Sequence, residues 1–237
     1  MRKYLIILMC ALVSCVGQKE DPDEPGPSGS VADKAAGLVM DFTATWCVNC
    51  PRMTSAIEEV SAQRAIIPIC VHFQDDMVCD DGKALVSHFG VQAYPTAVMN
   101  MDASTLITAT SKDLIIAKLD ASASGKEPCD VDILVGADGN VSVTVTAAEA
   151  GEYTLSVALL EDGVVAPQTG GSDNYVHNAV FRGFLQENLL GDSLGEISKG
   201  SSVERSFSPG SLSGKYRVVA FVCYEGKVNS AKSADLI

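Results

Sequence analysis

Two hydrophobic periodicities divide this chain of 237 residues into two parts. In the first part, short apolar runs alternate with stretches in which apolar residues recur every three or four positions. The run 38–42 is apolar except for Asp41, and Met53, Ile57 and Val60 follow at helical spacing. Apolar runs predict buried strands, and the helical spacing predicts amphipathic helices. The first part is therefore predicted to be an α/β domain.

Further elements follow in the same alternation. We expect strands at 38–42, 65–73, from Pro95 to 99 and at 105–109, and helices that begin at Pro51, at Lys83 and after the N-cap Ser111. Gly90 is expected to close the second helix. The order β-α-β-α-β-β-α predicts a sheet with helices on both faces.

The second part has a period of two. Residues 131–135, 140–146, 153–160 and 216–224 alternate between apolar and polar side chains, with glycine-containing turns between some of them. This pattern predicts an all-β sandwich of the immunoglobulin-like type. Residues 122–128, which contain Ser, Gly and Pro, are the predicted linker. We place the α/β domain at 31–124 and the β-sandwich at 125–237.

The N-terminal 15 residues are interpreted as a targeting segment and kept apart from the fold. A basic start precedes an apolar run, 4–13, that is too short for an ordinary transmembrane helix. The run leads into Leu-Val-Ser-Cys, which resembles a bacterial lipobox and implies lipidation of Cys15. A plain signal peptide and an uncleaved apolar tail are the alternatives. Residues 16–30 are rich in Pro, Gly and acidic residues and predict a disordered tether.

The composition and net charge of the chain bear on which classes of molecule it can bind. The formal net charge is −13, and 47% of the residues are hydrophobic. An acidic chain repels nucleic acid, which argues against a nucleic-acid partner. The acidic loop 74–82 lacks the spacing of an EF-hand, so we expect a solvated loop there. His72 and His88 have no ligand partner nearby in sequence, and we expect neither a metal nor an organic cofactor.

The candidate chemistry lies in Cys47 and Cys50, at the turn between the first strand and the first helix. Pro51 fits a first helical turn, where its missing N–H is tolerated. A helix N-terminus lowers the pKa of a nearby thiol from ~8.5 to as little as ~3.5–7.5. Cys50 is close enough in sequence to form a disulfide with Cys47, so the spacing predicts thiol–disulfide exchange. Zinc binding is the alternative, but no second ligand pair follows at the usual spacing.

This segment resembles the active-site segment of thioredoxin in its order of strand, Asp41, Trp46, Cys47, Cys50 and helix. The resemblance implies that Asp41 moves a proton to or from Cys50, and that Trp46 shapes the apolar surface around the Cys47 sulfur. The two residues between the cysteines are Val-Asn instead of the Gly-Pro of thioredoxin, so the redox potential is left open.

A second segment, 91–99, resembles the thioredoxin strand whose proline is cis and faces the disulfide. We therefore expect a cis Tyr94–Pro95 bond. The resemblance further implies that Pro95 helps to dock the backbone of a substrate.

The long insertion at 165–183 contains the run Tyr-x-His-Asn-x-Val-x-Arg, formed by Tyr175, His177, Asn178, Val180 and Arg182. Together with the lipobox and Trp-Cys-Val-Asn-Cys-Pro, it resembles the 28-kilodalton outer-membrane lipoprotein family of the Bacteroidetes type. That family pairs a thioredoxin-like domain with a β-sandwich. The polar residues of the run could form a ligand or partner site. They could equally hold the insertion by bonding backbone carbonyls, which we favour.

Four further cysteines, Cys70, Cys79, Cys129 and Cys223, permit three pairings. An exported protein allows disulfides. We expect Cys70 and Cys223, which lie in predicted strands, to be buried thiols. Cys79 and Cys129, in loop-like places, are the pair we expect.

Two functional hypotheses follow. The first is a membrane-anchored thiol–disulfide oxidoreductase of the cell envelope, lipid-anchored to the outer membrane, that acts on a protein or small-molecule thiol or disulfide. The second is a non-enzymatic surface binding or adhesion lipoprotein, in which the Cys47–Cys50 disulfide is a structural staple. The chain could also form a homodimer. A redox enzyme should leave the Cys47 sulfur open, whereas a staple should be covered.

Overall fold

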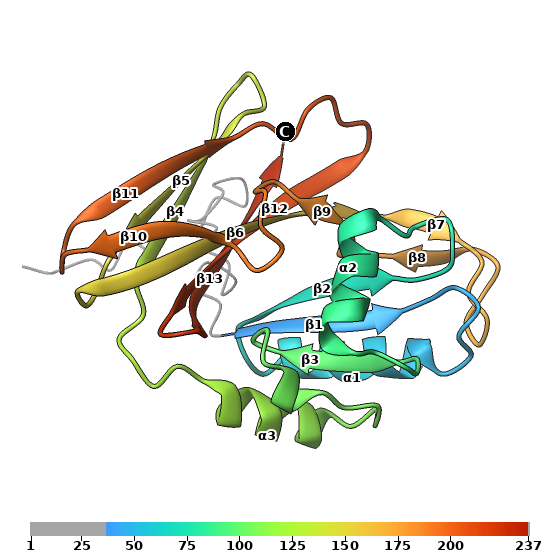
Figure 1. Cartoon of the computed structure of the whole chain (residues 1–237). Helices are drawn as coiled ribbons and strands as arrows, with labels where there is room; N and C mark the ends of the chain where they lie inside the picture. Colours follow the sequence, from blue (N-terminus) through green and yellow to red (C-terminus); the bar gives the residue numbers. More distant parts are fainter. Residues whose placement is uncertain (1–36, 237) are drawn as a thin grey trace, which may run out of the picture.

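The computed structural model describes residues 37–236 (Figure 1). The predicted signal peptide, the tether and Cys15 lie outside the described residues. No helix in the range 37–236 combines the length and the apolar character that crossing a membrane requires.

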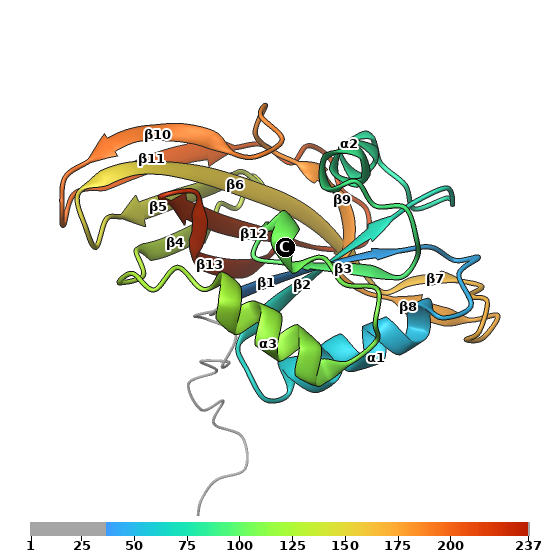
Figure 2. The ribbon, with the colours of Figure 1, turned by 60° about the horizontal axis from the view of Figure 1, so that its bottom comes forward.

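The first part of the chain forms a three-stranded segment of sheet with helices on both faces. Its elements are β1 (Gly37–Thr43), α1 (Cys50–Ser61), β2 (Ile66–His72), α2 (Asp80–Phe89), β3 (Thr96–Met99), η2 (Ala103–Thr105) and α3 (Lys112–Ser122). β1 lies in the centre, parallel to β2 and antiparallel to β3. Apolar residues of α1 and α3 pack together on one face, and α2 covers the other (Figure 2). The predicted α/β architecture is confirmed.

Several local expectations for this part are confirmed. Gly90 ends α2 in the left-handed conformation, with φ of 63°. The Ser111 side chain caps α3 by accepting from the N–H of Leu114 at 3.4 Å. The Tyr94–Pro95 peptide bond is cis. These signals lie within a few residues of the features that they predict.

The strand predicted at 105–109 is wrong. Residues 103–105 form the 3₁₀ turn η2, and only an isolated bridge between Ala97 and Ile107 follows. The Thr105 hydroxyl accepts from the N–H of Met99 at 2.8 Å and donates to the carbonyl of Asp102 at 2.6 Å. Such local bonds between side chain and backbone compete with a strand ladder.

The second part is rich in strands. They are β4 (Asp130–Val135), β5 (Val141–Thr146), β6 (Gly151–Asp162), β7 (Val164–Ala166), β8 (Tyr175–His177), β9 (Val180–Phe184), β10 (Asp192–Ile197), β11 (Ser202–Phe207), β12 (Lys215–Tyr224) and β13 (Lys227–Leu236). The sheet β11-β5-β4 faces the strands β13, β12, β6 and β10 across one apolar core. Alternate residues of β5, from Val141 to Val145, are fully buried there. The predicted sandwich of two sheets is confirmed.

The two parts share one sheet. Its strand order is β13-β12-β6-β9-β2-β1-β3, with β10 paired to β6 (Figure 1). β9 is the joining strand, because Val180 pairs with Cys70 of β2 while residues 180–184 pair with β6. A second core on this sheet combines Phe42 of β1 with Phe181 of β9 and Phe221 of β12. The insertion that contains β7, β8 and β9 therefore lies against the α/β part, and the domain boundaries at 124 and 125 stay a prediction.

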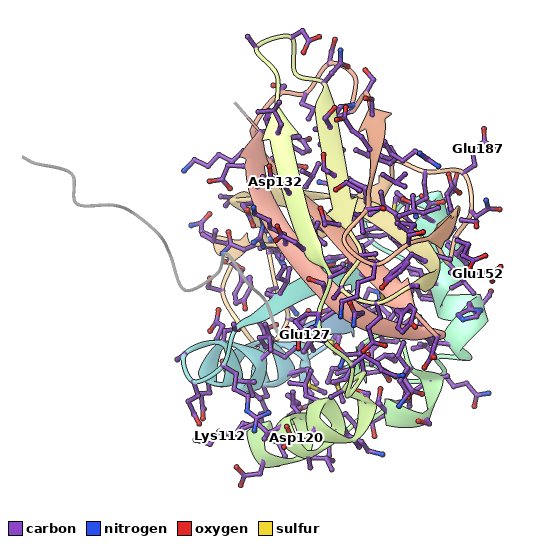
Figure 3. All side chains as sticks on the ribbon, turned by 90° about the vertical axis from the view of Figure 1, so that its left-hand side faces the viewer. Lys112, Asp120, Glu127, Asp132, Glu152 and Glu187 are labelled. Atoms are coloured by element: carbon purple, nitrogen blue, oxygen red, sulfur yellow. A yellow bond between two sulfur atoms is a disulfide. The ribbon has the colours of Figure 1, made fainter. Side chains whose placement is uncertain are left out.

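The acidic residues lie largely at the periphery. Figure 3 labels five of them on the two parts of the molecule, and all five are exposed: Asp120, Glu127, Asp132, Glu152 and Glu187. Asp41, in the middle of β1, is a fully buried exception.

Candidate functional site

The site is built around a disulfide between Cys47 and Cys50, whose Cα atoms are 5.4 Å apart. β1 ends at Thr43, and the chain turns before α1 begins at Cys50. The N–H of Cys47 donates to the carbonyl of Ala44 at 3.1 Å, which closes the turn. Pro51 occupies the first turn of α1, as predicted. The two sulfurs are thus held at the amino end of a helix, where the helix dipole favours negative charge.

Asp41 is the buried carboxylic acid of this site. It is fully buried in the middle of β1, and its Oδ2 accepts from the Thr54 hydroxyl of α1 at 3.3 Å. Its Oδ1 has no hydrogen-bond partner among the described residues. Burial raises the pKa of Asp41 from 3.8 to about 7, although the Thr54 hydroxyl works in the opposite direction. Asp41 can therefore take up or release a proton near neutral pH.

Aromatic rings form a rim beside the disulfide. Trp46 is 47% exposed, and its indole N–H donates to the carbonyl of Phe73 at 3.2 Å. The Tyr94 ring lies edge-on to Trp46 at 5.5 Å between centroids and stacks on Phe73 at 5.6 Å. Pro95 follows in the cis bond and is buried. Trp46 thus presents an exposed indole ring in this rim, and its role in shaping the surface around the Cys47 sulfur stays a prediction.

The acidic loop 74–82, for which we expect solvent exposure from the sequence, instead supports the site. Asp75 is largely buried and accepts from the N–H of Thr45 at 2.9 Å and from the N–H of Met77 at 2.9 Å. Its Oδ2 also lies 2.8 Å from Nδ1 of His72. Burial works to raise the pKa of Asp75, but the His72 ring and the N–H donors outweigh it and hold the pKa below its usual value. This role is not visible in the sequence, because an acid-rich loop alone does not show which acid turns inward.

The insertion covers one side of the disulfide. Gln168 is buried, and its Nε2 donates to the carbonyls of Ala44 at 3.2 Å and Cys47 at 3.0 Å. The N–H of Thr169 donates to the carbonyl of Thr45 at 2.8 Å. Beneath this segment Cys47 is only 5% exposed. No local signal could reveal these contacts, since more than 120 residues separate Gln168 from its partners.

Gly170 completes the cover. Its φ is +80°, and a Cβ at this position would lie 2.2 Å from the carbonyl oxygen of Val48. Only glycine lets the backbone approach the Cys47 turn so closely.

The structure separates the polar residues of the Tyr-x-His-Asn run. Asn178 accepts from the N–H of Gly163 at 3.0 Å, and Arg182 pairs with Glu161 at 2.7 Å. These two residues hold the insertion. Tyr175 is half-buried and His177 is buried, with their ring centroids 4.8 Å apart. A partner site formed by Tyr175, His177, Asn178 and Arg182 stays a prediction.

A cavity of about 110 Å³ lies behind the disulfide. Its lining includes Cys50, Asp41 and Thr54 from the α/β part and Tyr175 and His177 from β8. The ring of His177 also lies against that of His72, at 5.2 Å between centroids. The structure thus brings part of the insertion run to the site that the Cys-x-x-Cys segment predicts.

The expected pairing of Cys79 with Cys129 is wrong, since both are free thiols, as are Cys70 and Cys223. The Cys79 sulfur instead caps α2 by accepting from the N–H of Gly82 at 3.4 Å, and it lies 3.5 Å from the carbonyl of Phe181. Burial raises the pKa of Cys129 and of Cys223 to about 11, so both are poor nucleophiles. Within residues 37–236, no group of three or more His, Cys, Asp or Glu side chains could hold a metal ion.

Comparisons with known proteins agree with this architecture. Residues 82–234 match the model of the outer membrane protein Omp28 family, and residues 28–121 match that of thioredoxin. The solved structure of HBP35 of Porphyromonas gingivalis is similar with a TM-score of 0.67 and 20% identity, over 86% of this chain and 76% of that one. A crystal structure from Agrobacterium tumefaciens is similar with a TM-score of 0.57 and 14% identity, over 86% of this chain and 94% of that one. At these identities, the two structures support the fold alone. No curated protein matches the chain.

Proposed function

This chain belongs to the outer membrane protein Omp28 family, and we propose that it is a thiol–disulfide oxidoreductase of the cell envelope, anchored to the outer membrane through a lipid on Cys15. The thioredoxin domain and the disulfide at Cys-x-x-Cys spacing support the redox part. The lipobox-like end of the targeting segment supports the anchor.

The observation that carries the proposal is the buried Asp41 behind the disulfide. A structural staple needs no acid beside it, and burying a carboxyl group with one unpaired oxygen opposes folding. An exchange reaction does need such a group, because one sulfur must gain a proton when the disulfide opens and lose it when the disulfide closes. With a pKa of about 7, Asp41 can serve in both directions.

In the reducing direction, the Cys47 thiolate attacks a substrate disulfide and releases one substrate thiolate. This step forms a mixed disulfide between Cys47 and the substrate. The Asp41 carboxylate accepts the proton of Cys50, and the Cys50 sulfur then attacks Cys47 and releases the second substrate thiolate. The substrate gains two electrons, and the Cys47–Cys50 disulfide is formed. The oxidising direction reverses each step.

The reduction potential tests this proposal. Trp46, the single tryptophan of the chain, adjoins Cys47, so its fluorescence should report the redox state. The mature protein is equilibrated in thiol and disulfide buffers, with a Cys47→Ser variant as the blank. A potential of roughly −270 to −120 mV is expected, as in working exchange proteins. A value below about −300 mV, together with no turnover of a protein or glutathione disulfide, refutes the proposal.

The second candidate is a surface binding protein in which the disulfide is a staple. The cover formed by Gln168 and Gly170 favours it, because Cys47 is only 5% exposed. The same potential separates the two functions, since a covered structural disulfide resists reduction by cellular thiols.

A further inference from the structure

The Tyr-x-His-Asn run contains two residues that the proposed redox chemistry does not yet use. Asn178 and Arg182 have structural partners on the insertion, but Tyr175 and His177 line the cavity that Asp41 and Cys50 also line. Both come from the short strand β8, more than 120 residues from Asp41 in sequence. The cavity is thus shared by the two parts of the chain.

The cavity runs from a buried floor to the surface. Asp41 at the floor is fully buried, whereas Glu58, Ser61 and Val176 on the same lining are exposed. Its volume of about 110 Å³ compares with roughly 10–15 Å³ for the smallest site that holds one water. The cavity therefore has room for several water molecules.

Three buried polar atoms of the cavity residues have no hydrogen-bond partner among the described residues: Oδ1 of Asp41, Nε2 of His177 and Nε of Arg217. Asp41 is 0% exposed and His177 is 6% exposed. Buried polar groups are almost always hydrogen-bonded to protein or to ordered water. The cavity is large enough to hold water beside Asp41 and His177, both of which line it.

Hydroxyl side chains lead to Oδ2, the second carboxyl oxygen of Asp41. Thr54 donates its hydroxyl proton to Oδ2 of Asp41 at 3.3 Å. Burial raises the pKa of Tyr175, and hydrogen bonding with the Thr54 side chain works in the opposite direction. Tyr175 can therefore act on Asp41 through Thr54, because hydrogen bonds in a chain polarise one another.

We propose that Tyr175 and His177 are positioning residues of the redox site, which control the protonation of Asp41 through Thr54 and through water in the shared cavity. This inference rests on the proposed function, because the protonation of Asp41 matters to exchange at Cys50. It gives the Tyr-x-His pair a chemical role, and it makes β8 a working part of the thioredoxin-like site.

The other charged and titratable groups that line the cavity are Glu58 from α1, Cys70 and His72 from β2, and Arg217 from β12, whose Nε lies 3.0 Å from Oδ2 of Asp162 of β6. His72 is held by Asp75. Burial, and next the neighbouring His72, lower the pKa of His177, so His177 is neutral near pH 7 and offers a hydrogen-bonding nitrogen without a charge.

The test follows reduction of the oxidised protein by dithiothreitol in a stopped-flow instrument, with Trp46 fluorescence as the signal, from pH 5.5 to 9. Two electrons pass to the disulfide, and dithiothreitol is oxidised to its cyclic disulfide. Rates are corrected for the thiolate fraction of the reductant. Protonated Asp41 supplies the proton that Cys50 needs as it leaves, so the corrected rate should fall as pH rises through about 7.

The variants are Tyr175→Phe, His177→Phe, His177→Gln and Asp41→Asn, with Val165→Ala as the matched control on the same hairpin. Val165 pairs with Val176 and is 61% exposed. Tyr175→Phe and His177→Phe each remove a polar group that acts on Asp41 through Thr54 or through water, and each should move the inflection upward by about half to one pH unit. His177→Gln keeps a polar group and should restore the wild-type inflection, which Val165→Ala also keeps.

The outcomes separate this inference from the proposed function. If Asp41→Asn abolishes the inflection but Tyr175→Phe and His177→Phe leave it in place, the positioning role is refuted and the role of Asp41 stands. A hairpin with a purely structural role would give this result together with a lower melting temperature. If Asp41→Asn itself keeps the wild-type profile, the proton step of the proposed function fails, and the positioning role fails with it.

Discussion

Asp41 should make the oxidised protein less stable as the pH rises through neutrality, and Asp41→Asn should remove this loss. Burial raises the pKa of Asp41 from 3.8 to about 7, so between these values the folded chain binds a proton that the unfolded chain has released. The free energy of unfolding then decreases with pH across this window and levels off above it. At ~1.4 kcal/mol for each pKa unit, the total loss is about 4 kcal/mol.

Asparagine has nearly the shape of the protonated acid but does not titrate in this range. The stability of Asp41→Asn relative to wild type should therefore rise by about 4 kcal/mol between pH 4 and pH 8, which corresponds to roughly 2 M in the urea midpoint. Urea unfolding at several pH values measures this difference, and the same substitution at the exposed Asp76 is the control. A difference that stays constant over the range would refute the account of Asp41 as a buried acid that titrates near pH 7.

Two further predictions concern the segment 168–171, which covers Cys47, and the buried side-chain amide of Asn100. Gly170→Ala should displace the segment 168–171 and raise the alkylation rate of reduced Cys47 by about tenfold, because the added Cβ would meet the Val48 carbonyl. Gly139→Ala is the control, since Gly139 has a similar φ of +78° but open space around it. This control should lower the free energy of unfolding by only about 1 kcal/mol and leave the alkylation rate unchanged. Equal alkylation rates in the two variants would contradict the cover. Asn100→Ala should lower the free energy of unfolding, measured in urea, by about 2–4 kcal/mol, because buried Asn100 accepts from the N–H of Leu38 at 2.9 Å and donates to Ser122 at 2.9 Å. Asn174→Ala, at an exposed position, is the control, and an equally small loss in both variants would contradict this role of Asn100.

The sequence predicts the parts of this molecule that depend on neighbouring residues. The strand that contains Asp41, the turn with Cys47 and Cys50, and the helix that follows are separated by only a few positions, and each has a local signal. Periodicity likewise predicts the alternating strands of the second part. The predicted strand at 105–109 failed because the Thr105 side chain bonds the backbone of its own turn, an outcome that strand propensity does not register.

Contacts over long sequence distances could not be predicted in this way. Gln168 bonds the carbonyl of Cys47, and β9 inserts between β2 and β6, but neither segment differs in pattern from an ordinary polar insertion or a short strand. The expected pairing of Cys79 with Cys129 failed for the same reason, since a sequence gives no distance between two loops. The Tyr-x-His run stood out by resemblance, yet only the fold brings it to the cavity of Asp41.

The shared sheet places the insertion beside the proposed redox site. β9 pairs with β2 through Cys70 and Val180, and its Phe181 is buried in the same core as Phe42 of β1. A chain that ended at residue 124 would expose the open edge of β2 and the apolar face of β1, both of which favour aggregation. Because β8 precedes β9 by only two residues, the docking of β9 also fixes Tyr175 and His177 beside Asp41. The strand-rich part therefore completes the core of the thioredoxin-like part and contributes Tyr175 and His177 to the cavity that Asp41 lines.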